Sequence, residues 1–203
     1  MAGEMNMTKR QSDRLRLFLA ISIPETIRAA LLGLQQELRP LLPAHAVRWT
    51  QPDQFHLTLK FLGHVPASDT AALSEAVRAV CDTAPPMGLR AEGTGFFPND
   101  RAPRVFWADI KNDDGRLFQL QEQLAAAVAK FAEKQDPKPF TAHVTLARME
   151  RLSRSDSETM VSCARPNRDF GSWTAGQIEL VQSTLSPSGA TYAIFAAFAT
   201  KKV

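Results

Sequence analysis

The sequence predicts an α+β protein in which two pseudo-symmetric, mostly antiparallel sheets flanked by helices form two lobes around a central cleft. Candidate strands and helices recur in a loosely repeated order, and the connections between strands are short, as in antiparallel sheets. Two stretches, Phe55–Gly63 and Thr141–Arg148, both carry histidine, an aliphatic residue, threonine and leucine in that order. Their histidines lie 87 positions apart (143 − 56). One such stretch in each lobe would account for this spacing.

Length and composition fit a single globular domain with a substantial core. The chain has 203 residues, of which 44% are hydrophobic and 22% are charged. We expect residues 1–14 to be a disordered lead-in and residues 15–203 to form one bilobal domain with one His-x-Thr motif in each half. The net charge of +3 is compatible with a polyanionic substrate but does not by itself indicate nucleic acid.

No targeting or membrane signal is found in the sequence. The first residues lack the apolar segment of a secretory signal, and no apolar run has the length of a transmembrane helix. Cys81 and Cys163 are far apart and belong to no metal-binding pattern, which favours reduced thiols. We therefore expect a cytoplasmic protein that does not bind membranes and that is a monomer.

The first half is predicted to contain four strands and two helices. Leu15–Ile23 is almost continuously apolar, which is typical of a strand in the middle of a sheet. Pro24 suits the first turn of a following helix. Gly93 and Gly95 predict a bulge or bend in the fourth strand. The remaining elements are helices over Glu25–Leu38 and Thr70–Cys81 and strands over Val47–Thr50, Phe55–Leu62 and Met87–Phe97.

The second half repeats this alternation. Its clearest helix is Arg116–Lys134, where leucines recur at helical spacing. The other predicted elements are a helix over Ser153–Ala164 and strands over Val105–Ile110, Thr141–Arg148, Trp173–Ser183 and Thr191–Thr200.

The two His/Thr stretches carry the chemistry. Side chains two apart in a strand share a face, so His56 lies beside Thr58 and His143 beside Thr145. Two imidazoles can act as general base and general acid near neutral pH, and threonine hydroxyls can bond phosphoryl oxygens. This inventory suits displacement at phosphorus and needs neither a metal nor a cofactor.

The paired motifs HLTL and HVTL resemble those of the 2H phosphoesterase superfamily, and the surrounding residues resemble its bacterial RNA 2′,3′-cyclic phosphodiesterases, also called 2′-5′ RNA ligases. The resemblance spans roughly residues 15–200. Besides HLTLKFLG and HVTLAR, it is carried by Arg16–Ile21, Trp49 with Thr50, Phe96–Asn99, Pro103–Trp107, and Ser183–Ser186 with Gly189 and Tyr192.

The resemblance implies opening of a terminal 2′,3′-cyclic phosphate on RNA, or of a cyclic nucleotide, to a 2′-phosphate, with a weak reverse 2′-5′ ligase activity in some members. It implies His56 and His143 as the acid/base pair and Thr58, Thr145 and Arg148 as phosphate-binding residues. Because the 3′-oxygen is the group expelled for this product, we assign His56 as the acid that protonates it and His143 as the base that activates water, although the sequence does not fix this polarity. Strict alternation, however, places Arg148 on the face opposite His143. A bend near the strand end would remove this conflict.

Three alternatives stay open at this point. The cleft of a non-catalytic module could bind a nucleotide or RNA end without turning it over. Asp53, Glu150 or Asp156 could join the histidines in a metal site, although their spacing matches no familiar ligand set. Ligation could be the physiological direction, although the concentration of water favours hydrolysis. Lys60 is expected on the face of His56, either near an RNA phosphate or in solvent.

Overall fold

All the strands that the structure describes are joined into one antiparallel sheet. The computed structural model describes residues 13–134, 139–150, 152–187 and 189–201. The strand order is β7-β4-β5-β6-β3-β1-β8-β9, and β2 pairs with β6 beside this path. The strands are β1 (Arg14–Ser22), β2 (Val47–Trp49), β3 (His56–Pro66), β4 (Met87–Phe97), β5 (Val105–Lys111), β6 (His143–Met149), β7 (Asp169–Ala175), β8 (Gln177–Ser186) and β9 (Gly189–Ala199).

The predicted α+β class is confirmed, and the two predicted sheets are two halves of this one sheet. One half has the strand order β7-β4-β5-β6 and the other has the order β3-β1-β8-β9. The two halves are joined where β3 pairs with β6, and this pairing is limited to Leu57 and Val144. Within each half the ladders are longer: β1 pairs with β3 from Arg14 to Ser22. The single connecting pair places β3 and β6, the two His/Thr strands, at the centre of the molecule.

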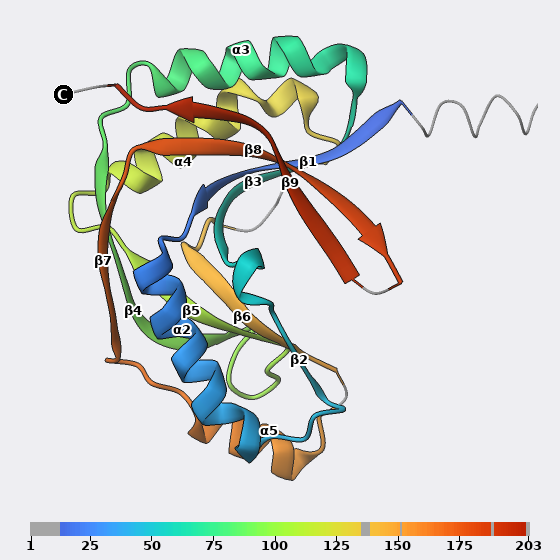
Figure 1. Cartoon of the computed structure of the whole chain (residues 1–203), viewed down its shortest axis with the longest axis vertical. Coiled ribbons are helices and arrows are strands. Elements are labelled where there is room, and N and C mark those ends of the chain that lie inside the picture. Colours follow the sequence, from blue (N-terminus) through green and yellow to red (C-terminus); the bar gives the residue numbers. More distant parts are fainter. Residues whose placement is uncertain (1–12, 135–138, 151, 188, 202–203) are drawn as a thin grey trace, which may run out of the picture.

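Helices cover the two halves separately. α3 (Thr70–Cys81) and α4 (Arg116–Ala127) lie along the half that contains β1, β3 and β8, whereas α2 (Glu25–Leu38) and α5 (Arg154–Ser162) lie beside the other half (Figure 1). The apolar stripes predicted for α2 and α4 are buried against the sheet, with Leu31, Leu34, Leu117 and Leu124 fully inaccessible. Short 3-10 turns occupy Arg39–Leu41, Pro52–Gln54, Ala67–Asp69 and Ala129–Phe131.

Some predicted boundaries were wrong. The strand predicted over Trp173–Ser183 is two strands that separate at Gly176, because β7 pairs with β4 in one half and β8 pairs with β1 in the other. The helix predicted to reach Lys134 ends at Ala127 and is followed by a 3-10 turn. Of the predicted lead-in, residues 1–12 lie outside the described residues, and Arg14 is already part of β1. The bulge predicted at Gly93 is confirmed by a register shift and a φ of +86°.

Both cysteines are free, as predicted, and both are buried. Among the described residues, no helix is long and apolar enough to cross a membrane.

Candidate active site

The two histidines begin the two central strands, β3 and β6. Leu57 and Val144 are paired and fully buried, so their side chains face the core. Flanking residues in a strand point the other way. His56 and Thr58 therefore share one open face with His143 and Thr145, and all four residues are partly accessible. The rings are close enough that positive charge on His143 lowers the pKa of His56.

Both imidazoles are held by the same local bond. Nδ1 of His56 lies 2.7 Å from the carbonyl oxygen of Gln54, and Nδ1 of His143 lies 2.7 Å from that of Thr141. Because a carbonyl oxygen only accepts, each Nδ1 carries the hydrogen and donates it. This fixes the tautomer of both neutral rings and leaves Nε2 as the atom that can take or give a proton.

Aromatic rings enclose each histidine. The centroid of the His56 ring lies 4.9 Å from that of Phe18 and 5.3 Å from that of Tyr192. The His143 ring lies 4.9 Å from Phe97, which meets it edge-on. Such packing restricts the rotation of the rings and removes water from one side of each. Sequence reasoning did not assign any of these aromatic residues to the site.

Burial is the main reason that both histidines have a lowered pKa. It lowers the pKa of His56 below the ordinary value of 6.5; the bond to Gln54 opposes this, and the charges of His143 and Arg148 add to the lowering. Burial also lowers the pKa of His143, where the bond to Thr141 opposes it and Arg148 adds to it. Glu179 and Asp109 weakly oppose the lowering at His56 and His143, respectively. Both rings therefore favour the neutral form more than free histidine does.

This electrostatic arrangement predicts how stability depends on pH. Each histidine has a lower pKa in the folded chain than in the unfolded chain, so the unfolded state binds more protons below pH 6.5. The stabilisation that these two histidines provide is complete above their pKa in the unfolded chain, and it is lost as the pH falls through their lower pKa in the folded chain. We expect the double variant His56→Asn/His143→Asn, whose amides can retain the local bond, to lose less free energy of unfolding than wild type between about pH 7.5 and 5. Urea denaturation across this range measures the difference; equal losses in the two proteins would contradict the prediction.

A β-bulge follows the threonine in each strand. The register of β6 against β5 skips Leu146, and the register of β3 against β1 skips Leu59. At each bulge two consecutive side chains are buried, those of Leu146 and Ala147 in β6 and those of Leu59 and Lys60 in β3. The next side chain in each strand is exposed again. The bulge therefore brings Arg148 onto the face of His143 and Thr145. This resolves the conflict that strict alternation created, and the influence of Arg148 on the pKa of both histidines agrees with it.

The same bulge corrects the expectation for Lys60. It pairs with Leu19, which is fully buried in the core, and is itself only 9% exposed, so it does not share the open face of His56. Phe61 takes the position on β3 that Arg148 takes on β6. Its side chain is 52% exposed and its ring centroid lies 5.6 Å from that of Phe18, the neighbour of His56.

Glutamines from two helices hold the bulges. Nε2 of Gln35 in α2 donates to the carbonyl oxygen of Leu146 at 2.8 Å and to that of Thr50 at 2.9 Å. Nε2 of Gln121 in α4 donates to the carbonyl oxygen of Leu59 at 3.2 Å. The carbonyl that each bulge exposes is thus satisfied in the same way in both halves. Gln35 is completely buried, and a polar residue within the apolar stripe of its helix was the available sequence signal.

The polar groups on the open face are free to bind a ligand. Among the described residues, the hydroxyls of Thr58 and Thr145 and the guanidinium of Arg148 make no hydrogen bond or ion pair. No group of three or more His, Cys, Asp or Glu side chains in the described ranges could hold a metal ion. The face thus presents two Nε2 atoms, two hydroxyls and one guanidinium.

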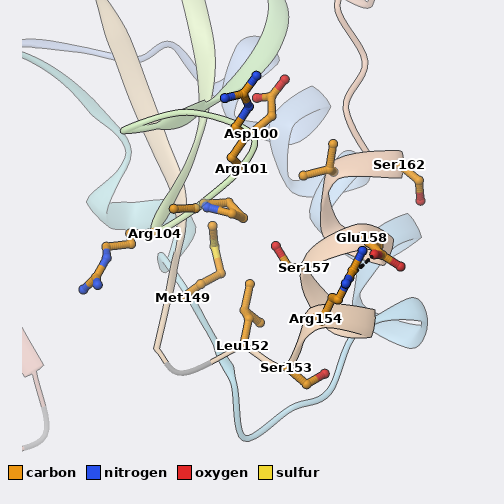
Figure 2. A pocket seen from close by; sticks show the side chains of 13 residues that line it. Asp100, Arg101, Arg104, Met149, Leu152, Ser153, Arg154, Ser157, Glu158 and Ser162 are labelled. Atoms are coloured by element: carbon orange, nitrogen blue, oxygen red, sulfur yellow. Dashed lines mark hydrogen bonds and ion pairs between the residues drawn. The ribbon is translucent and has the colours of Figure 1, made fainter.

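A separate hollow of about 940 Å³ lies between the 100–104 loop and α5 and includes none of the predicted site residues. Met149, Leu152 and Val161 contribute its apolar surface, and Arg101, Ser153 and Ser157 are among its polar lining (Figure 2). Met149, the last residue of β6, lines this hollow and directly follows Arg148 in the sequence.

Comparisons with known proteins agree with this architecture. The chain matches the family model described as LigT-like phosphoesterase over residues 21–107 and again over 110–192, so each match contains one His/Thr strand. A protein of Archaeoglobus fulgidus named RNA 2′,3′-cyclic phosphodiesterase is 31% identical over 178 residues, which cover 88% of this chain and 96% of that protein. A protein of Thermus thermophilus with the same name is 31% identical over 193 residues, covering 92% of this chain and 91% of that protein.

Solved structures show the same fold. A crystal structure of a Thermus thermophilus protein superposes with a TM-score of 0.77 at 31% identity, covering 92% of this chain and 98% of that one. Escherichia coli LigT in complex with 3′-AMP gives a TM-score of 0.73 at 26% identity, covering 93% and 99% of the two chains. With both halves matched and the fold shared over nearly the whole length, the chain belongs to the LigT-like phosphoesterase family, a family of 2H phosphoesterases.

Proposed function

We propose that the protein is an RNA 2′,3′-cyclic phosphodiesterase that hydrolyses a terminal 2′,3′-cyclic phosphate to a 2′-phosphate. The observation that carries the proposal is the shared face of β3 and β6. There, two histidines with fixed Nδ1–H groups expose Nε2 beside two unbonded threonine hydroxyls. The names of the relatives support the choice of substrate.

The proposed reaction is an in-line displacement by water at phosphorus. Nε2 of His143 takes a proton from water as the new O–P bond forms, and Nε2 of His56 gives a proton to the departing 3′-oxygen as the P–O3′ bond breaks. The product is a 2′-phosphomonoester and a free 3′-hydroxyl. Positive charge on His143 lowers the pKa of His56, which disfavours the state in which both rings are protonated.

Thr58, Thr145 and Arg148 are proposed to bind the non-bridging phosphoryl oxygens. A guanidinium and two hydroxyls that are already fixed on one face stabilise the charge that builds up on these oxygens without reorganising. Phe61, at the position equivalent to Arg148, offers an exposed ring on which the terminal nucleobase can stack. The same groups would catalyse a weak 2′-5′ ligation when the 5′-hydroxyl of an RNA attacks phosphorus in place of water: His143 takes the proton of that hydroxyl as the O5′–P bond forms, and His56 gives a proton to the 3′-oxygen as the P–O3′ bond breaks.

Product analysis with an oligoribonucleotide that ends in a 2′,3′-cyclic phosphate tests the proposal. In the presence of EDTA we expect complete conversion to the 2′-phosphate, because imidazole and threonine supply every proposed role. Chromatography against authentic 2′- and 3′-phosphates identifies the product. A 3′-phosphate would contradict the proposed leaving group, and binding without turnover would indicate a non-catalytic module. Activity that is lost in EDTA and restored by zinc or manganese would indicate a metallohydrolase.

A further inference from the structure

The open face of the two histidines extends onto the neighbouring strand β5, where it carries a carboxylate. Asp109 is directly opposite His143 across β5 and β6, and Trp107 is directly opposite Thr145. Directly opposed residues of antiparallel strands project from the same face, with Cβ atoms about 5 Å apart. The charge of Asp109 and that of protonated His143 each shift the pKa of the other group, in agreement with this closeness. Asp109 therefore lies beside the imidazole of the proposed base.

This carboxylate has no cation of its own. Among the described residues, its side chain is hydrogen-bonded only to the backbone N–H of Ile110. The two cations that act on Asp109 are Lys111, two positions further along β5, and protonated His143. Lys111 already forms an ion pair with Glu92 on β4. Protonated His143 is therefore the cation that Asp109 is free to stabilise.

The fold keeps Asp109 at this position at a cost in stability. The residue is partly buried, and burial is the main reason that the pKa of its carboxyl is raised; the charge of Lys111 and the N–H of Ile110 oppose the rise most strongly. The charges of Glu92 and protonated His143 contribute less, in opposite directions. A raised pKa means that the ionised carboxyl is less favourable in the folded chain than in the unfolded chain. Ionisable groups that are perturbed in this way gather at functional sites.

The two histidines differ in this neighbour. The residue opposite His56 on β1 is Ser22, which carries no charge. The carboxylate that acts on His56 belongs to Glu179 on β8, one strand further away, where it is opposite Ala20. Of the two histidines, only His143 has a carboxylate directly opposite it in the strand pairs that the structure describes. The surroundings of the two rings are thus electrostatically unequal.

We propose that Asp109 is a positioning residue that stabilises the positive charge His143 acquires when it takes the proton of the attacking water, and that Asp109 thereby makes His143 the base of the pair. The inference rests on the proposed function and deepens it by giving a physical reason for the division of roles. A base gains positive charge in this step, so a neighbouring carboxylate lowers the barrier. An acid loses positive charge, so a carboxylate beside it would hold back its proton. Arg148, which disfavours positive charge on both histidines, lies near the other end of β6 and is opposite Val105.

The test combines the variant Asp109→Asn with a cyclic-phosphate oligonucleotide in which sulfur replaces the 3′-oxygen. A thiolate leaves without protonation, so the rate on this substrate depends on the base alone, and its pH–rate profile keeps only the limb on which the base loses its proton. The carboxylate raises the pKa of His143, so its removal should move this limb to lower pH. The rate above the limb should fall by a factor of about two to five, as for the loss of one partly exposed charge pair. Asp109→Glu retains the charge and should keep the limb near its wild-type position.

Asp113→Asn is the matched control, because Asp113 is an exposed aspartate beyond the end of β5 that pairs with Arg90; it should change neither the limb nor the rate. A limb that stays at its wild-type position in Asp109→Asn would overturn the inference while leaving the proposed function intact. An effect of Asp109→Asn that is present on the all-oxygen substrate and absent on the sulfur substrate would also overturn it, since Asp109 would then act on the acid. If wild type opens neither substrate, the proposed function itself fails. Unfolding in urea checks the fold, and Asp109→Asn should not lower the free energy of unfolding, because it removes a partly buried charge that has no cation of its own.

Discussion

Replacing His56 or His143 with alanine is expected to lower kcat/KM for opening a 2′,3′-cyclic phosphate by a factor of about 10² to 10⁴, the usual contribution of a general acid or base. Each substitution removes an Nε2 atom that the neighbouring hydroxyls of Thr58 and Thr145 cannot replace, because a hydroxyl does not transfer protons readily near neutral pH. The rings lie at the open face rather than in the core, so the fold should persist. Steady-state kinetics on a cyclic-phosphate oligonucleotide measure the loss.

His64 provides the matched control, because it lies in the same strand as His56 but outside the proposed site. Its Nδ1 lies 3.2 Å from Oε2 of Glu133, and its side chain is exposed. We expect His64→Ala to retain wild-type activity. Near-normal turnover in His56→Ala and His143→Ala, with circular dichroism spectra like that of wild type, would refute the two-histidine mechanism.

The roles of the two histidines can be separated with a substrate in which sulfur replaces the 3′-oxygen of the cyclic phosphate. A thiolate leaves without protonation, so the variant that lacks the acid should recover most of the lost rate on this substrate, whereas the variant that lacks the base should not. With His56 as the acid, recovery is expected in His56→Ala alone. Recovery in His143→Ala instead would reverse the assignment and preserve the mechanism.

Local patterns were sufficient to predict the parts of the site that follow strand periodicity. Alternation around Leu57 and Val144 placed His56 beside Thr58 and His143 beside Thr145, and the structure shows these pairs on one face. The spacing of the two motifs also predicted a repeat with one His/Thr strand in each half, whereas the direct pairing of β3 with β6 was not predicted. Such features depend only on neighbours in the chain and on the need to bury one face of a strand.

The prediction that side chains alternate strictly between the two faces of a strand failed where residues distant in the sequence determine the backbone conformation. Neither Leu59 nor Leu146 is followed by a glycine or proline that would signal a bulge; each bulge is held by a glutamine from a helix remote in sequence, Gln121 or Gln35. The pairing of Arg48 with Arg148 likewise depends on β2 joining β6 across 100 positions (148 − 48). The missed strand break at Gly176 has the same origin, because only the arrangement of both halves shows that the chain crosses between them there.

Replacing Arg148 with glutamine is expected to lower kcat/KM by about two orders of magnitude, because it removes a charge-assisted bond to the phosphoryl group, each such bond being worth about 1.5–3 kcal/mol. Lysine at this position should recover only part of the activity, since a point charge does not reproduce the planar, bidentate guanidinium. Both variants should keep their stability, because Arg148 is exposed and bonded to no described residue.

The pH–rate profile distinguishes an electrostatic role of Arg148 from a purely steric one. The positive charge of Arg148 lowers the pKa of both His56 and His143, so its removal should raise both and move the two limbs of the pH–rate profile to higher pH. Arg148→Lys retains the charge and should leave the limbs near their wild-type positions. An Arg148→Gln profile that superposes on that of wild type would show that the guanidinium does not act on the histidines.

Phe61→Leu is the matched test of the asymmetry between the halves, since Phe61 occupies on β3 the place that Arg148 occupies on β6. Removing an uncharged ring should weaken the binding of the nucleobase and raise KM, while leaving the limbs of the pH–rate profile in place. A repeated fold with two equivalent histidines would otherwise accept its substrate in either orientation. We propose that the guanidinium of Arg148 on β6 and the phenyl ring of Phe61 on β3 allow only one orientation, with the phosphate toward β6 and the base toward β3. In this proposal the asymmetry gives the two similarly held imidazoles different neighbours, and a difference of this kind is needed if one histidine is to act as the acid and the other as the base.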